Sequence, residues 1–247
     1  ITTSGQLSIR WIEKALNAYL NKIMETDNED YVIASDTDSV YITFEKLVSL
    51  VFKEGTSNEA IVNFLDKIAK EKLEPFINKS YKLLAEQMNA YDQKMFMARE
   101  VIADRGIWTA KKRYVLNCWD IEGVRYKEPK LKIMGIEAVK SSTPAPCREK
   151  IRDAMNIIMN GNEKELNKFI QNFREEFMKL EPEDIAYPRS CNGLMKWEGS
   201  HELWRKGAPI HVKGALLFNY LIDKNKLENK YVKIQEGDKI RFLHMKQ

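Results

Sequence analysis

The sequence has 247 residues, of which 44% are hydrophobic and 31% are charged, and its net charge is +4. A chain of this size and composition can bury a core, and its alternating helical and strand-like stretches predict an α+β protein. No apolar run approaches the length of a membrane span, so we expect no membrane partner. The three cysteines have neither metal-ligand spacing nor a disulfide pattern, which predicts a reducing, cytoplasmic location. Ile1 in place of an initiating methionine suggests a fragment or a processed chain.

Positive charge is concentrated in residues 105–150. This stretch has eleven Lys or Arg and five Asp or Glu, a net charge of +6, so the rest of the chain carries −2 (4 − 6). A local basic excess indicates either a surface that faces a polyanion or a solvated strand face. Charge alone leaves both interpretations open.

The first predicted elements are a long helix and a β-hairpin. Thr3 and Gln6 fit a capping box, and apolar residues at helical spacing predict a helix from Thr3 to about Met24. The apolar residues of that helix are Ile12, Leu16, Tyr19 and Ile23. Two β-rich runs, 31–34 and 40–44, enclose a polar segment and predict a hairpin.

Helices and then strands are predicted up to the middle of the chain. One helix begins at Asn58, and a second begins near Pro75 and runs to about Ala90, because proline suits a first helical turn and not an interior. The predicted strands that follow are Met95–Ala103, Trp108–Trp119 and Leu131–Ile136, with a turn at Asp120–Gly123.

A linker-like composition marks residues 141–146, and we place a domain boundary near Ser141. Two helices are predicted beyond it, one stopping at Gly161 and the next capped by Asn162. The mixed, loop-rich tail from residue 181 onward is left without assigned elements.

Asp36 and Asp38 are the sharpest chemical feature of the sequence. Two carboxylates separated by one residue at a hairpin tip repel each other unless a cation lies nearby. Mg²⁺ prefers carboxylate oxygens and keeps coordination positions open for phosphate. A plain polar turn is the alternative, since Asp, Thr and Ser are common turn residues.

The segment 31–41 around these carboxylates resembles motif C of the family B DNA polymerases, in particular those of T-even bacteriophages. The resemblance implies that Asp38 is a metal-binding carboxylate and that Asp36 supports it. It also implies a two-metal Mg²⁺ site that needs a further Asp, from a motif A that this sequence lacks. Ala34 and Ser35 stand where the family usually has Tyr-Gly, which puts the geometry of the turn in question.

Four later segments are similar to parts of the same family that contact DNA. Lys111–Tyr114 matches the Lys-Lys-Arg-Tyr segment that grips the primer-side duplex, and 128–137, 141–144 and 210–214 match segments between palm and thumb or within the thumb. By resemblance, the DNA-binding residues are Lys111, Lys112, Arg113, Tyr114, Lys130, Lys132, Ser141, Ser142, Thr143, His211 and Lys213. The alternatives are a solvated strand edge, a plain linker and a structural histidine.

Glu100 is a third candidate carboxylate. Phage polymerases carry acidic residues at the positions of Ala98 and Glu100, close to the metals, and only the second is acidic here. The resemblance implies a catalytic or supporting role for Glu100. A surface charge or an ion-pair partner is the alternative.

The resemblance implies a polymerase palm with an antiparallel sheet and packed helices over 1–140. A mainly helical thumb, incomplete at its C-terminal end, follows over 141–247. Motif A, the fingers and an exonuclease domain are absent, so we expect the chain alone to be inactive. Its partners would be primer-template DNA, a dNTP held by the fingers, the remaining polymerase and a sliding clamp.

Two other functions compete with this one. A non-catalytic DNA-binding subunit of a split polymerase would use the same basic surface. A Mg²⁺-dependent nuclease would use Asp36 and Asp38, but the sequence shows no further ligands at readable spacing. The polymerase part is the hypothesis that we carry forward.

Overall fold

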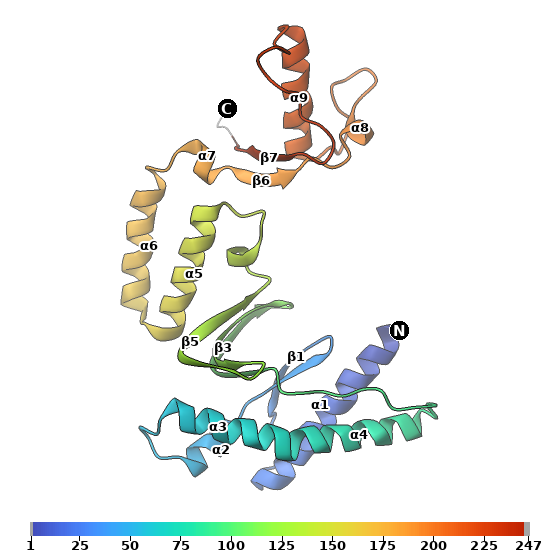
Figure 1. Ribbon diagram of the computed structural model, residues 1–247, viewed down its shortest axis with the longest axis vertical. Helices are drawn as coiled ribbons and strands as arrows, with labels where there is room; N and C mark the ends of the chain where they lie inside the picture. The colour runs from blue at the N-terminus through green and yellow to red at the C-terminus, as the bar shows by residue number, and fades with distance from the viewer. Residues whose placement is uncertain (1, 245–247) are drawn as a thin grey trace. The chain divides into compact units, whose positions relative to one another are not determined.

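The computed structural model describes residues 2–244, which form two compact units divided between Lys132 and Ile133. Helices and small antiparallel sheets make up both units, so the predicted α+β class is confirmed (Figure 1). The division between the units falls within strand β5 (Val124–Met134).

Helix α1 (Thr2–Met24) is the first layer of the N-terminal unit. It buries Ile12, Leu16 and Leu20 at helical spacing, whereas the predicted Ile23 is 52% exposed. The helix already includes Thr2, so Thr3 is not its cap and the predicted capping box is wrong. The buried stripe packs on the helix α4 (Glu74–Gln87), which α1 crosses in Figure 1.

The predicted hairpin is confirmed as strands β1 (Val32–Asp36) and β2 (Ser39–Ile42). The strands extend further toward the turn than predicted, leaving a turn of only Thr37 and Asp38, whereas β2 ends two residues before the predicted Phe44. Asn17 of α1 holds the start of the hairpin, because its side-chain oxygen accepts hydrogen bonds from the backbone of Tyr31 and Val32, each at 2.9 Å.

Three consecutive helical segments follow a short helix α2 (Glu45–Val51), which the sequence analysis missed. Helix α3 (Asn58–Ile68) begins at its cap Ser57 and passes without a break through the π-helical η1 (Ala69–Leu73) into α4. Pro75 lies in the first turn of α4, as predicted. A π-helix takes more residues per turn than an α-helix. The η1 segment therefore changes the direction in which the side chains of α4 face relative to those of α3.

The central sheet of the N-terminal unit has the order β3-β4-β5. Strand β3 (Val101–Ala110) begins six residues after the predicted start at Met95. Residues 88–100 contain no strand or helix. The single strand predicted for Trp108–Trp119 is wrong: a turn at Lys111 and Lys112 separates β3 from β4 (Arg113–Ile121). Lys112 adopts a positive φ of 60°, which a tight two-residue turn requires.

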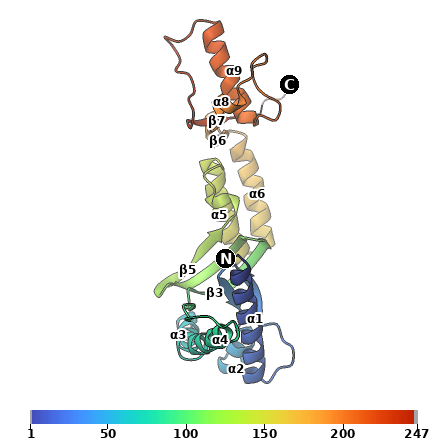
Figure 2. The same cartoon turned by 90° about the vertical axis from the view of Figure 1, so that its right-hand side faces the viewer.

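Helices α5 (Ala145–Asn160) and α6 (Glu163–Phe177) form a hairpin in the C-terminal unit, side by side in Figures 1 and 2. The predicted stop at Gly161 and the cap at Asn162 are confirmed: the Asn162 side chain accepts from the Glu165 amide at 3.0 Å. The 3₁₀-helix η2 (Glu137–Val139) packs against α5.

The C-terminal tail is more regular than the sequence indicated. It contains a 15-residue helix α9 (Ile210–Lys224) that packs on strand β7. The other elements are α7 (Pro182–Ile185), β6 (Tyr187–Ser190), α8 (Leu194–Trp197) and β7 (Lys239–Phe242). Strands β6 and β7 pair across about 50 residues of chain, which local patterns cannot reveal.

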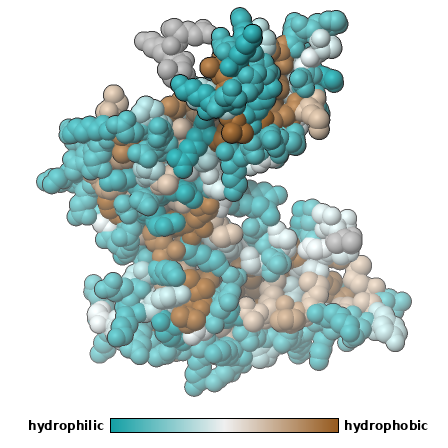
Figure 3. Space-filling view, turned by 45° about the horizontal axis from the view of Figure 1, so that its top comes forward, coloured by the Kyte–Doolittle hydropathy of each residue, from teal (hydrophilic) through white to brown (hydrophobic). Residues whose placement is uncertain are grey.

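Hydrophilic side chains cover most of the face seen in Figure 3, between smaller apolar areas. None of the helices within residues 2–244 is long and apolar enough to cross a membrane.

Candidate active site

Asp36 and Asp38 flank the tip of the β1–β2 hairpin. Asp36 ends β1, with its side chain 28% exposed, and the Asp38 amide donates to its carbonyl at 2.6 Å. Thr37 has a positive φ of 50°, and its hydroxyl donates to the Asp36 carboxylate at 3.1 Å. Asp38 is exposed, and within residues 2–244 its carboxylate forms no hydrogen bond or ion pair. The hairpin therefore holds one carboxylate in place and leaves the other open to a ligand.

The β3–β4 turn meets this hairpin tip. The Lys112 ammonium lies 3.7 Å from Oδ1 of Asp36 and 3.4 Å from the hydroxyl of Thr37. A hollow of about 380 Å³ opens between the two turns, lined by residues of both. The lining includes Ser35, Asp36, Tyr41, Trp108, Lys111, Lys112 and Tyr114. The structure thus brings two predicted site segments together on one surface.

Three aromatic residues in contact with one another line part of the hollow. The Tyr41 ring of β2 lies edge-on to Trp108 of β3 at 5.2 Å and to Tyr114 of β4 at 5.5 Å between centroids. Burial, then hydrogen bonding with Tyr41 and the charges of Glu100 and Asp36, raise the pKa of Tyr114 far above its ordinary value. Tyr114 is therefore neutral and buried, with only part of its surface lining the hollow.

Glu100 lies at the end of the coil that precedes β3. Its side chain is 53% exposed and forms an ion pair with the ammonium of Lys132 on β5. Lys130 lies two residues earlier on β5, and its ammonium is 5.4 Å from the centroid of the Tyr126 ring. Both β5 lysines that were predicted to bind DNA thus contact side chains of this chain, and Lys132 contacts a predicted site carboxylate.

A cluster of charged residues that joins α3 to β4 was not predicted from the sequence. Asp120 at the end of β4 is fully buried and pairs with the guanidinium groups of Arg99 and Arg125. Asp66 of α3 accepts from the same Arg99 at 2.7 Å and from Lys70 at 2.9 Å. Burial opposes ionisation of Asp66, but these hydrogen bonds outweigh it and hold its pKa below the usual range. Lys70 follows Asp66 at the ordinary i,i+4 helical spacing, but no local spacing connects Asp66, Arg99 and Asp120, so sequence alone gave no signal of their contact.

The comparisons with known proteins agree with the motifs. Over its whole length the chain is 37% identical to a DNA-directed DNA polymerase of Escherichia phage RB69. Over 88% of its length it is 36% identical to the corresponding polymerase of Enterobacteria phage T4. The chain is homologous to part of these family B phage polymerases. It spans 28% of the first and 25% of the second, and no family model matches it.

The homology confirms the predicted resemblance to T-even phage polymerases and leaves the role of each residue as a prediction. For a metal, Asp36 and Asp38 supply oxygen donors of the kind that Mg²⁺ prefers. Among residues 2–244, no three or more His, Cys, Asp or Glu side chains lie together as a metal-binding group. Carboxylates of this hairpin fit Mg²⁺ as part of a larger ligand set, since Mg²⁺ is usually bound by one or two carboxylates together with substrate phosphates and water.

The remaining predicted DNA-binding residues lie in the C-terminal unit of this polymerase homologue. Ser141, Ser142 and Thr143 precede the N-terminus of α5 and are not part of any helix or strand. His211, in the first turn of α9, stacks on Phe242 with 5.9 Å between ring centroids. Lys213 lies over the Trp204 ring at 5.8 Å. His211 and Lys213 are both half-buried, so each already has a packing role.

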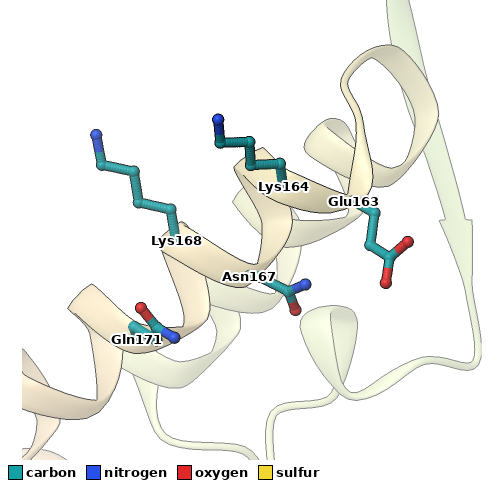
Figure 4. A pocket seen from close by; sticks show the side chains of 5 residues that line it. All are labelled: Glu163, Lys164, Asn167, Lys168 and Gln171. Carbon is teal, nitrogen blue, oxygen red and sulfur yellow. The ribbon is translucent and has the colours of Figure 1, made fainter.

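A second hollow, of about 430 Å³, lies on α6 alone. Figure 4 shows Lys164 and Lys168 extending outward from that helix, with Glu163, Asn167 and Gln171 along it. A polar face of one helix is the ordinary solvent side of an amphipathic helix. We therefore assign no function to it.

Proposed function

We propose that this chain forms the motif C side of the active site of a DNA-directed DNA polymerase, together with its primer-template grip. The observation that carries the proposal is the meeting of two turns. The carboxylate hairpin tip and the Lys111–Lys112 turn lie on one hollow, although they are about 75 residues apart in sequence. A site for nucleotidyl transfer needs both metal-binding oxygens and cations for the DNA backbone at such close quarters.

In this proposal, Asp38 would hold Mg²⁺ near the primer terminus with Asp36 as a supporting carboxylate, together with an Asp from the part of the polymerase that this sequence lacks. The primer 3′-hydroxyl attacks the α-phosphorus of a dNTP, and the bond to pyrophosphate breaks. Mg²⁺, when bound, stabilises the attacking and leaving oxygens. Glu100 supplies a further carboxylate in this proposal, because it matches one of the acidic positions of the phage polymerases.

The duplex grip is assigned to cations and backbone amides of both units. Lys111, Lys112 and Arg113 contact phosphates and the minor-groove edge, which positions the duplex without reading its sequence. Residues 1–140 act as palm and 141–247 as thumb. Ser141–Thr143 precede the 16-residue helix α5, whose N-terminal amides suit a primer phosphate. Primer-template DNA, a dNTP, the remaining polymerase and a sliding clamp are the proposed partners.

A chimeric polymerase tests this function. This chain replaces the segment of the phage RB69 polymerase with which it aligns, and primer extension is measured with Mg²⁺ and all four dNTPs. We expect extension, and we expect Asp38→Ala to abolish it while primer-template affinity stays within a few-fold. Asp27→Ala, at another exposed aspartate, is the matched control and should extend normally.

Two results would contradict the proposal: robust extension by Asp38→Ala, or a folded wild-type chimera that binds DNA and adds no nucleotide. The second result would favour a non-catalytic DNA-binding subunit, which needs the basic turn and not the carboxylates.

A further inference from the structure

The two faces of the β1–β2 hairpin pack on different parts of the N-terminal unit. Val40 and Ile42 of β2 pack against the hydrophobic core that α1 and α4 form. Tyr41 lies between them in sequence and packs instead against Tyr114 and its neighbours on the β3–β4 hairpin. Side chains alternate between the two faces along a strand, so this division follows from the order of residues in β2. Tyr41 therefore connects the carboxylate hairpin to the neighbouring sheet.

The Tyr41 side chain lies on the same face of the hairpin as that of Asp36. In the register of the two strands, Ser39 lies opposite Asp36, and Tyr41 is two residues beyond Ser39. Residues directly opposite each other share a face of the sheet, and so do residues two apart on one strand. The face that presents the Asp36 carboxylate is therefore the face that Tyr41 fixes to the β3–β4 hairpin.

The rings that contact Tyr41 lie at the base of the Lys111–Lys112 turn. Trp108 and Tyr114 are direct partners across β3 and β4, with 6.3 Å between their ring centroids. The Tyr41 ring lies edge-on to both, with its centroid 5.2 Å from that of Trp108 and 5.5 Å from that of Tyr114. Gly106 leaves room for this arrangement, because a Cβ there would lie 2.8 Å from the Trp108 ring. One ring of the carboxylate hairpin thus contacts both strands that enter and leave the basic turn.

The ion pair between the two turns is too weak to fix their separation. The ammonium of Lys112 lies 3.7 Å from Asp36, and the Lys112 side chain is 64% exposed. Exposed pairs of this kind are screened by solvent and salt and contribute little. Tyr114, in contrast, is buried, and the rings that it contacts are half-buried. Packed rings have few alternative positions, so these ring contacts, and not the ion pair, determine the distance across the hollow.

We propose that Tyr41 is a positioning residue, which fixes the carboxylate hairpin tip relative to the Lys111–Lys112 turn through its ring contacts with Trp108 and Tyr114. The inference rests on the proposed function, in which the tip binds metal and the turn binds the duplex. A misplacement of about 1 Å can slow a reaction by roughly 100-fold. Loss of the Tyr41 ring should therefore slow nucleotide addition. It should leave the DNA affinity within a few-fold, because every cation of the basic turn remains.

The first test reports the separation of the two turns in the chain itself, without DNA or metal. A water-soluble carbodiimide forms an amide bond between a carboxylate and an amine in contact, here Asp36 and Lys112, and the water that is lost converts the reagent into a urea. Peptide mass spectrometry compares the yield with that of Asp223 and Lys233, an ion pair of 2.5 Å in the C-terminal unit. Tyr41→Leu should lose most of the Asp36–Lys112 product, whereas Tyr41→Phe keeps the ring and should retain it.

The second test is single-turnover nucleotide addition by the chimeric polymerase at saturating Mg²⁺ and DNA. Tyr41→Leu should lower the rate constant by roughly 100-fold, and Tyr41→Phe should restore it. Tyr19→Leu is the matched control, because Tyr19 is also half-buried and stacks on Phe76, with 4.0 Å between ring centroids, but does not line the hollow. A loss of packing alone lowers the folded fraction, so Tyr19→Leu should reduce the amplitude of the reaction and keep its rate constant.

Two results would overturn the inference. One is an unchanged Asp36–Lys112 yield in Tyr41→Leu, even with slow addition, since Tyr41 would then act by touching the substrate. The other is a normal rate constant with a reduced amplitude, which is the pattern of a purely structural residue. If Tyr41→Leu does not fold, Trp108→Leu removes the same contact from β3 and should cause both losses. An inactive wild-type chimera would count against the proposed function alone, because the cross-linking test does not depend on activity.

Discussion

The ammonium of Lys112 lies 3.7 Å from the carboxylate of Asp36, across the hollow between two turns. Both groups are solvent-accessible, with side chains 64% and 28% exposed, so the pair is screened and weak. A DNA phosphate can therefore replace Asp36 as the partner of Lys112 without a large free-energy cost. The contact places a cation that we propose binds duplex DNA next to the proposed metal-binding hairpin.

Lys111, Lys112 and Arg113 should bind duplex DNA independently of its sequence. Each substitution by Ala should weaken all primer-templates alike and reduce the log–log salt slope by roughly one unit per lost phosphate contact. Fluorescence titrations at several salt concentrations measure this. Lys82→Ala, at an exposed lysine of α4, should leave the slope unchanged. A loss of affinity confined to certain template sequences would argue against phosphate contacts.

The chain by itself should bind primer-template weakly and add no nucleotide. A few phosphate contacts give non-specific dissociation constants of about 10⁻⁴ to 10⁻⁶ M at physiological salt. One pair of carboxylates cannot position two metals around a triphosphate, and positioning supplies most of the catalysis in phosphoryl transfer. Primer extension above a no-protein control would show that our division of the active site is wrong.

Gly106→Ala should destabilise the N-terminal unit by about 1–3 kcal/mol. A Cβ at this position would lie 2.8 Å from the Trp108 ring and 2.9 Å from Leu116, closer than packed carbons approach. Urea unfolding measures the change. Gly214→Ala is the control, since a Cβ there meets no atom within 4 Å in the middle of α9, and we expect it to stabilise by about 0.5–1 kcal/mol. An unaffected Gly106→Ala would mean that Trp108 moves freely.

Stability should fall between about pH 9 and pH 11 because of Cys118. Burial of this thiol raises its pKa from 9.0 to about 11. The unfolded chain therefore loses the thiol proton first, so the stabilisation is complete below pH 9 and is lost as pH rises toward 11. The slope is about 1.4 kcal/mol per pH unit. In Cys118→Ala, urea midpoints should fall less steeply over this range; an identical slope would exclude the thiol as the cause.

The elements predicted correctly are those with strong local signals. Short stretches of sequence were enough to predict helix α1, the hairpin at Asp36 and the cap at Asn162. The turn at Lys111 and Lys112 was missed because neither residue is a typical turn former, and β-rich residues continue on both sides. Tertiary packing of the two strands overrides that continuity.

The candidate site was predictable only through its motifs. The resemblance singled out Asp36 and Lys112, but their contact depends on how β2 and β3 pack through Tyr41 and Trp108. Asp66 and Arg99 gave no signal at all, because ion pairs between residues 33 positions apart have no characteristic spacing. Such contacts come from the fold and not from local pattern.

The π-helical segment η1 sets a constraint on chain length. An α-helix turns by about 100° per residue, so the extra residue of a π-turn decides which way each flanking helix faces. Asp66 before η1 faces Arg99, whereas Leu73 and Ile77 are buried in the α1 core. Deleting one residue of Ala69–Leu73 would remove no side chain of α3 or α4. It would, however, rotate one helix relative to the other, so that either Asp66 no longer faces Arg99 or Ile77 no longer faces the α1 core. Among homologous chains, we therefore expect the residue count here to vary less than the residues themselves.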